Sequence, residues 1–254
     1  MKGTGRFIST LGALAVIVVG VGACGGGGSG QTVAQVQGVG AISKGTLEHW
    51  IPIEARLVYQ EVPTRPVPRG VVPDPPVYAA CVSYLQTTRQ KIVETGPKPT
   101  AAQLRTRCAQ KYHEITVLAL NTLINWDWTL GMGAAAGMKV TDAEVRQRLE
   151  AVKRNNLTGV PFAKYLRYSG QTEADMLFRS KVQLFEVKFQ ERLDAMVKRL
   201  PHGLSAKQRQ RALAQFAAKL PTNRQWVART TCSAGYVTSS CKQYRGSQPP
   251  GIPN

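Results

Sequence analysis

The chain is short of acidic residues, of histidine and of long apolar runs. It has 15 Asp and Glu against 33 Lys and Arg, only three His, and no acidic residue after Asp194. Few carboxylates weaken any hydrolase mechanism, which needs paired acids or a base positioned beside a nucleophile. Only His113 lies within a few residues of a cysteine, and no CxxC occurs, so the usual spacing of zinc ligands is missing. We therefore predict no catalytic residue, no cofactor and no metal site.

The most apolar stretch, Leu11–Val21, is also short. A membrane-spanning helix needs about 20 mainly apolar residues, so this run is marginal as a span. Lys2 and Arg6 precede it and small residues end it, which is typical of a secretory signal. We expect residues 1–23 to be a signal peptide. A retained membrane anchor is the alternative.

The residues that end this stretch, Val21-Gly22-Ala23-Cys24, resemble a bacterial lipobox, in which the cysteine receives lipid and becomes the mature N-terminus. This resemblance implies lipidation of Cys24 and attachment to the extracytoplasmic face of the cell membrane. Residues 24–31 would then be a lipidated cysteine with a flexible glycine-rich tether. Ordinary signal cleavage without lipid is the alternative.

Four cysteines remain once Cys24 is assigned to lipid: Cys81, Cys108, Cys232 and Cys241. An even number in an oxidising compartment predicts disulfides, whose connectivity spacing alone does not fix. Pairing of sequence neighbours, Cys81 with Cys108 and Cys232 with Cys241, closes short loops and is the simplest arrangement.

The positive charge is large and unevenly placed. The net charge of +18 falls by two, to +16, without Lys2 and Arg6, and residues 201–254 contain eight Lys and Arg and no acid. Such asymmetry points to an anionic neighbour such as lipid head groups, envelope polymers or acidic clients. Export argues against nucleic acid as that neighbour. The alternative is a general surface property without a dedicated partner.

Two long amphipathic helices are predicted from helical spacing of apolar residues. The first starts at a capping box of Thr100 and Gln103 and carries a stripe as far as Trp126. The glycines after it, in "GMGAAAG", indicate close helix packing and a helix stop. The second starts at Thr172, also with a capping box. Its stripe consists of Phe178, Val182, Phe185, Phe189, Leu193, Met196 and Leu200. A helix this long in a small domain can leave part of its face open.

Shorter elements are expected around these helices. They are an edge strand at 32–36, a helix capped by Ser43 and disturbed by Pro52, a proline-rich surface loop at 63–76, a helix starting at Pro75-Pro76, a helix from Thr141 to about Asn155, a basic helix at 205–220 and a strand pair at 226–241. We expect the N-terminal strand and the C-terminal disulfide segment to pack together. One mainly α-helical domain would then span 32–245, followed by a disordered tail at 246–254.

The order of these elements resembles the SurA- and PrsA-type extracytoplasmic foldases. The matching segments are "VAQVQGVGAISKGTLEHWI", "GMKVTDAEVRQRLEAVKR" and "GQTEADMLFRSKVQLFEVKF", and the ending "RTTCSAGYVTSSC" is similar to that of actinobacterial lipoprotein members. The resemblance implies a SurA-like or trigger-factor-like helical chaperone core with a short N-terminal strand and a small disulfide-closed C-terminal β segment. Gln37 departs from the family pattern, which has Asn before the glycine.

The family usually carries a parvulin-type prolyl isomerase domain between the long helix and the closing segment. Here only residues 201–225 lie in that place, with His202 as the one histidine and no acid. No catalytic residue of the family therefore has a counterpart, although prolyl isomerase activity stays an alternative.

The resemblance and the composition together predict a membrane-tethered chaperone that binds unfolded exported polypeptides in an apolar groove. The side chains expected to contact such clients are Trp126, Trp128, Met176, Phe185 and Met196. Packing of these side chains in the core is the alternative. A basic binder of anionic envelope polymers is a further alternative for the whole protein.

Overall fold

The structure is a computed structural model that describes residues 30–91, 98–155, 159–200, 204–218 and 220–246. The signal segment, Cys24, most of the tether, His202 and most of the expected C-terminal tail lie outside these ranges. The described residues form eight helices and three short strands: β1 Thr32–Val36, β2 Gly40–Ser43, α1 Lys44–Tyr59, α2 Ala79–Lys91, α3 Ala101–Ala135, α4 Asp142–Arg154, α5 Phe162–Ser169, α6 Glu173–Lys198, α7 Ala206–Ala217, α8 Asn223–Arg229 and β3 Thr230–Cys232.

The three strands form one antiparallel sheet in the order β2-β1-β3. β1 is therefore the central strand, and the prediction that it lies at an edge is wrong. Its partners come from both ends of the chain, with Ala34 opposite Ile42 on one side and opposite Cys232 on the other. The expected association of the N-terminal strand with the C-terminal segment is confirmed.

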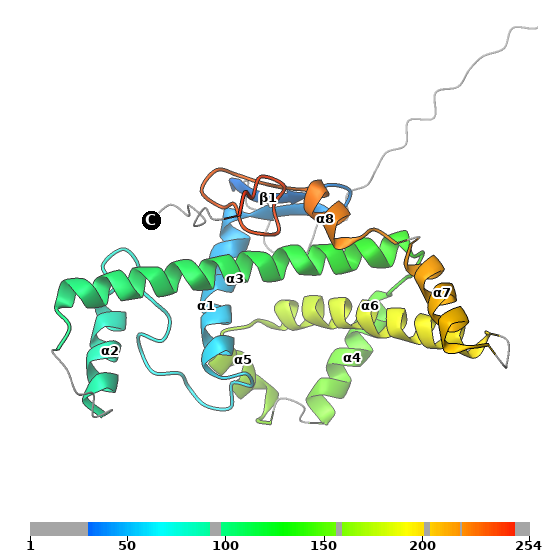
Figure 1. Ribbon diagram of the computed structural model, residues 1–254. Helices are drawn as coiled ribbons and strands as arrows, with labels where there is room; N and C mark the ends of the chain where they lie inside the picture. The colour runs from blue at the N-terminus through cyan, green and yellow to red at the C-terminus, as the bar shows by residue number, and fades with distance from the viewer. Residues whose placement is uncertain (1–29, 92–97, 156–158, 201–203, 219, 247–254) are drawn as a thin grey trace, which may run out of the picture.

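Helix α3 is the axis of the molecule. Figure 1 shows the sheet and α8 on one side of this helix and α4, α5 and α6 on the other. Helices α1 and α6 pack directly on α3, and α4 packs on α6. The main core lies where α1, α3 and the sheet meet, around fully buried residues such as Val36, Ile53 and Ile124.

Two glycines of α3 let neighbouring elements approach closely. A Cβ atom at Gly131 would stand 2.3 Å from the ring of Trp226, and one at Gly133 would stand 2.2 Å from the ring of Phe185. The helix ends at Ala135, and two residues on Gly137 has a left-handed φ of +66°, while the amide of Met138 donates to the carbonyl of Gly133 at 2.9 Å. Both predicted roles of this segment, close packing and a helix stop, are confirmed.

The capping residues fix the helix starts as expected. Thr100, Thr141 and Thr172 each close a reciprocal capping box with the residue three positions on, and Ser43 caps α1. Helix α1 nevertheless continues through Pro52 to Tyr59, so the expected disturbance is not seen. Burial of the residues around Pro52 against α3 stabilises the helix despite the donor that proline lacks.

Helix α2 begins later than predicted, at Ala79. The carboxylate of Asp74 accepts hydrogen bonds from the amides of Ala80 and Cys81, at 3.0 and 3.1 Å, and so caps it from the loop. That proline-rich loop is not merely a surface segment, because Pro63, Val71 and Pro73 are buried.

The C-terminal segment differs from the predicted strand pair. Trp226 belongs to α8, β3 is its only strand, and turns occupy the remainder to Cys241. The outer edge of β3 is instead covered by the side chain of Gln243, whose amide bonds the backbone N–H and C=O of Cys232 at 3.2 and 2.8 Å.

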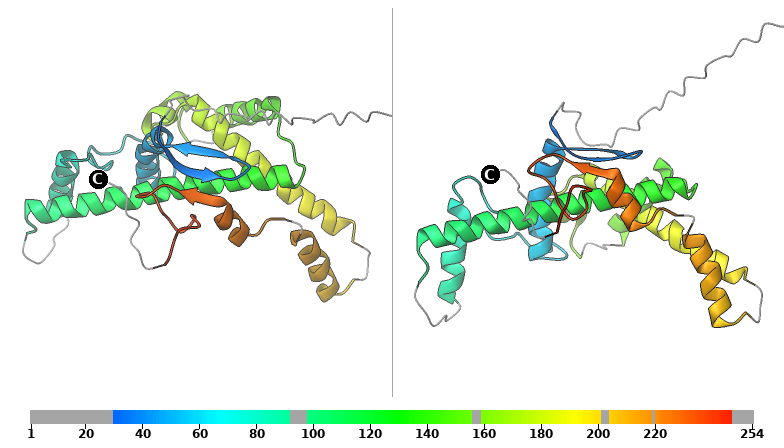
Figure 2. Two further views of the ribbon diagram at one scale, coloured as in Figure 1. Left: turned by 90° about the horizontal axis from the view of Figure 1, so that it is seen from above. Right: turned by 45° about the horizontal axis from the view of Figure 1, so that its top comes forward.

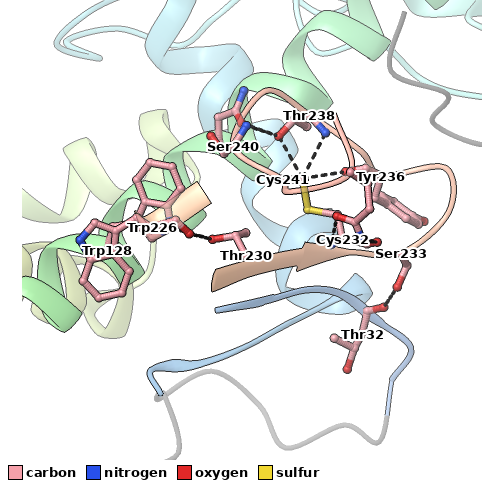
Figure 3. The surroundings of a disulfide bond; sticks show 12 residues. Thr32, Trp128, Trp226, Thr230, Cys232, Ser233, Tyr236, Thr238, Ser240 and Cys241 are labelled. Carbon is pink, nitrogen blue, oxygen red and sulfur yellow. Dashed lines mark hydrogen bonds between the residues drawn. A yellow bond between two sulfur atoms is a disulfide. The ribbon is translucent and has the colours of Figure 1, made fainter. Parts of the chain in front are cut away.

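Both neighbour-paired disulfides form. Cys81 joins Cys108 and so ties α2 to α3, whereas Cys232 joins Cys241 and closes the loop after β3. Figure 3 shows the second bond with Tyr236 and Thr238 inside the loop that it closes.

Candidate functional site

The apolar stripe of α6 continues beyond the core. Its buried residues are Met176, Ser180, Val182 and Phe185, and no described residue of the helix after Phe185 is buried. Leu193 and Met196 continue the stripe but are only half-buried, and Val187 and Val197 are 47% and 42% exposed. The same helix therefore changes from a core element into a partly open one within a single turn.

We call residues 186–198 of α6 together with α7 the arm. Figures 1 and 2 show α7 beside the far end of α6, at the periphery of the molecule. Among the α7 side chains that the structure describes, none is buried, and Ala212 and Leu213 are half-buried. The arm is thus a thin helical pair whose apolar side chains remain accessible in part.

The outer end of the arm is basic. The exposed cations there are Lys198, Arg199, Lys207, Arg209 and Arg211, and no acidic residue follows Asp194 in the sequence. Residues 186–198 also expose Glu186, Glu191 and Asp194, so the positive charge is concentrated at the outer end. There it attracts acidic client segments, since Coulomb steering adds to burial.

Hydrogen bonds and an ion pair fix the root of the arm. The Lys188 ammonium contacts the Glu144 carboxylate and the carbonyl of Lys139, both at 2.6 Å. The Arg192 guanidinium donates to the carbonyl of Ala136. These bonds join α6 to the end of α3 and the start of α4. The Lys188 ammonium, together with the bonds from Thr141, lowers the pKa of Glu144 from 4.5 to about 2.

A buried polar cluster lies where α1, α3 and α6 meet. Burial raises the pKa of Glu54, while the hydrogen bond with Thr122 and the charge of Arg179 act against that rise. The Nη1 atom of Arg179 is buried without a hydrogen-bond partner. The cluster joins the helix that becomes the arm to the two central helices.

Three of the five predicted contact residues, Trp128, Met176 and Phe185, are buried, and Trp126 is partly buried against the core. Trp128 is buried and donates from Nε1 to the Thr230 hydroxyl at 2.9 Å. Trp126 packs edge-on against Trp50 and Phe178, at ring-centroid distances of 4.8 and 5.7 Å.

Met176 and Phe185 are each 8% exposed, so neither offers a surface to a client in this conformation. Met196 alone lies on the arm. The sequence pattern did not predict that Val187 and Val197 are exposed, because both lie off the stripe. The length of α6 relative to the domain was the signal that part of the helix surface is open.

The comparisons with known proteins identify no relative. No family model matches the chain, and neither a curated protein nor a solved structure matches it.

The described residues contain neither a metal-binding cluster nor a membrane-spanning helix. No group of three or more His, Cys, Asp or Glu side chains there is placed to hold a metal ion. None of the helices in those ranges combines the length and hydropathy that a membrane span requires.

Proposed function

We propose that the protein binds unfolded exported polypeptides along the arm while a lipid on Cys24 holds it at the extracytoplasmic face of the membrane. The observation that carries this proposal is the apolar stripe of α6, which leaves the core after Phe185 and is covered beyond that point only in part. If the stripe served core packing alone, its apolar residues would stop where α6 leaves the core.

The chemistry of the arm suits weak and unspecific binding. Met196 and Leu193 have flexible side chains that adapt to clients of different shape. Every further apolar group that a client places on the strip contributes about 25 cal/mol per Å² of area removed from water. The basic outer end adds steering for acidic segments and makes binding fall as salt rises.

An aggregation assay tests the proposal. The fragment 25–254 keeps every described residue, and a several-fold excess should suppress aggregation of a chemically unfolded client. The double variant Leu193→Glu/Met196→Glu should lose most of this effect, because it places two charges on the apolar strip.

Gln183→Glu/Gln110→Glu is the matched control. It adds the same charge at two exposed positions outside the arm, one in the first half of α6 and one in α3. If both variants protect the client as well as the parent at equal melting temperature, the arm is not the binding surface.

The lipid anchor is tested separately. Growth with an alkyne-bearing fatty acid should label the parent chain and leave Cys24→Ser unlabelled. An unlabelled parent that keeps its uncleaved N-terminus in the membrane fraction would instead favour the retained span.

The acid-free C-terminal region supports a second candidate, binding of anionic envelope polymers. Lys207, Arg209 and Arg211 are exposed on one short helix. If the protein has this function, polymer binding should be strong at low salt and lost at high salt. The Leu193→Glu/Met196→Glu variant should retain at least part of this binding.

A further inference from the structure

A pocket of about 390 Å³ lies away from the arm, where five segments of the chain meet. These are the start of β1, the first turns of α1, the loop before α2, the middle of α3 and the loop after β3. None of its lining residues belongs to the arm, and nothing in the proposed function uses it. Its volume is at the lower end of the range of roughly 300–1,000 Å³ that is typical of ligand sites.

The inner walls are apolar and aromatic. Leu47 and Ile51 of α1 are buried and present one aliphatic side. Tyr112 of α3 and Tyr236 of the C-terminal loop contribute two rings. Thr116 lies one turn beyond Tyr112, and its hydroxyl donates to the Tyr112 carbonyl at 2.8 Å, so that donor is already used.

Both disulfides hold these walls in place. Tyr112 follows Cys108 by one turn of α3 and packs against the Cys81–Cys108 pair. Tyr236 lies inside the loop that Cys232 and Cys241 close, as Figure 3 shows. A pocket whose walls are fixed before binding loses little conformational entropy when a ligand enters.

The rim is polar and carries one charge of each sign. Lys44 and Glu48 lie 3.8 Å apart, with side chains that are 48% and 59% exposed. Burial and the nearby Glu48 carboxylate raise the pKa of Tyr112, so that phenol stays neutral and protonated. A rim with one donor and one acceptor suits a peptide backbone, whose C=O accepts from Lys44 and whose N–H donates to Glu48.

We infer that this pocket binds one aromatic side chain of an extended polypeptide, with the adjoining backbone across the Lys44–Glu48 rim. The ring would lie between Tyr112 and Tyr236, where stacked or edge-on contacts add to burial against Leu47 and Ile51. The balanced rim charge and the apolar interior favour an uncharged ring over a cation or an anion. The inference is independent of the arm, because the two surfaces share no residue.

Binding of blocked tripeptides to the fragment 25–254 tests the inference. Acetyl-Gly-Phe-Gly-amide should bind at least about tenfold more tightly than acetyl-Gly-Ala-Gly-amide, the difference expected for burying a ring. The measurement is NMR chemical-shift perturbation of the amides of Ala234, Thr116 and Leu47. Acetyl-Gly-Asp-Gly-amide and acetyl-Gly-Lys-Gly-amide should bind no better than the alanine peptide.

One variant fills the pocket from its edge. Ala234 is an exposed lining residue, and Ala234→Phe should abolish the preference for the phenylalanine peptide. Ala41→Phe adds the same ring at an exposed position of β2 that does not line the pocket, and should keep the preference within about twofold.

Equal binding of the phenylalanine and alanine peptides would overturn the inference. So would a preference that Ala234→Phe leaves unchanged at an unchanged melting temperature. Neither result bears on client protection by the arm, which the Leu193→Glu/Met196→Glu variant probes on its own.

Discussion

The Ser233 hydroxyl donates a hydrogen bond to the carbonyl of Thr32 at 2.6 Å, across 201 positions of sequence. The amide of Ser233 also donates to the carbonyl of Val33 at 2.9 Å, and the amide of Gln37 donates to the carbonyl of Arg229 at 3.0 Å. Figure 3 shows the hydrogen bond between Ser233 and Thr32 beside the C-terminal disulfide. The two ends of the domain thus complete one sheet, and the fold closes only when both are present.

Removal of the C-terminal segment should therefore destabilise the whole domain. A fragment ending at Pro221 lacks α8 and β3, which exposes the buried side of β1 and takes away Trp226, which is 3% exposed. We expect its thermal unfolding, followed by circular dichroism, to lose cooperativity or to shift to much lower temperature. A fragment ending at Gly246 keeps both elements and should melt like the parent; equal melting of both fragments would contradict the closure.

Gly133→Ala should destabilise the protein by about 1–3 kcal/mol, because the new methyl group overlaps the Phe185 ring in a packed interior. Denaturant unfolding measures the change. Gly45→Ala is the control. This residue also lies in a helix, and its new methyl group would stand 3.9 Å from the Ser43 hydroxyl, so the change should leave stability unchanged or raise it by up to about 1 kcal/mol. Similar effects at both positions would show that the approach of α6 to α3 is not tight.

Asp127→Asn should stabilise the protein at neutral pH. Burial raises the pKa of Asp127 from 3.8 to about 6, so the folded state binds this proton more strongly than the unfolded state. The stability contributed by protonation is complete below pH 3.8 and is lost as pH rises towards 6. The variant should therefore gain about 3 kcal/mol over the parent at pH 7–8 and almost nothing near pH 3.5. Urea unfolding across this range measures the difference; a constant difference would contradict the assignment to this carboxyl.

Lys188→Met should loosen the root of the arm and raise the pKa of Glu144 from about 2 towards 4.5. In the parent, the lowered pKa contributes stability that is present above pH 4.5 and is lost as pH falls towards 2. An NMR titration of the Glu144 carboxyl measures the first effect, and faster amide exchange in residues 186–198 reports the second. Lys181→Met removes a charge earlier in α6 and should change neither quantity.

Fragment 25–254 should not accelerate a refolding reaction that is limited by prolyl isomerisation. The described residues between α6 and β3 form two short helices and no strand, whereas a parvulin-type site needs a sheet. The measurement is the slow refolding phase of a proline-limited substrate with and without excess protein. Acceleration above the uncatalysed rate would favour the isomerase alternative.

Local sequence signals determined much of the fold. Thr100, Thr141 and Thr172 predicted three helix starts correctly, because a capping box is satisfied within four consecutive residues. The neighbour pairing of the cysteines, which short separations favoured but did not fix, also forms. The mainly helical class and the meeting of the chain ends were likewise predicted from these patterns, whereas a likeness to SurA-type foldases stays a proposal.

Tertiary structure decided what lies inside and what lies open. The periodic pattern of α6 runs unbroken through Phe185 and Met196, yet the first is buried against Gly133 of α3 and the second lies on the arm. Trp126 and Trp128 were predicted as possible contact residues, but β3 helps to bury Trp128, and α1 and α6 cover Trp126 in part. Helical spacing records which side of a helix is apolar. Whether that side is buried depends on which distant segment packs against it. A distant segment also made β1 the central strand, since its second partner, β3, comes from the far end of the chain.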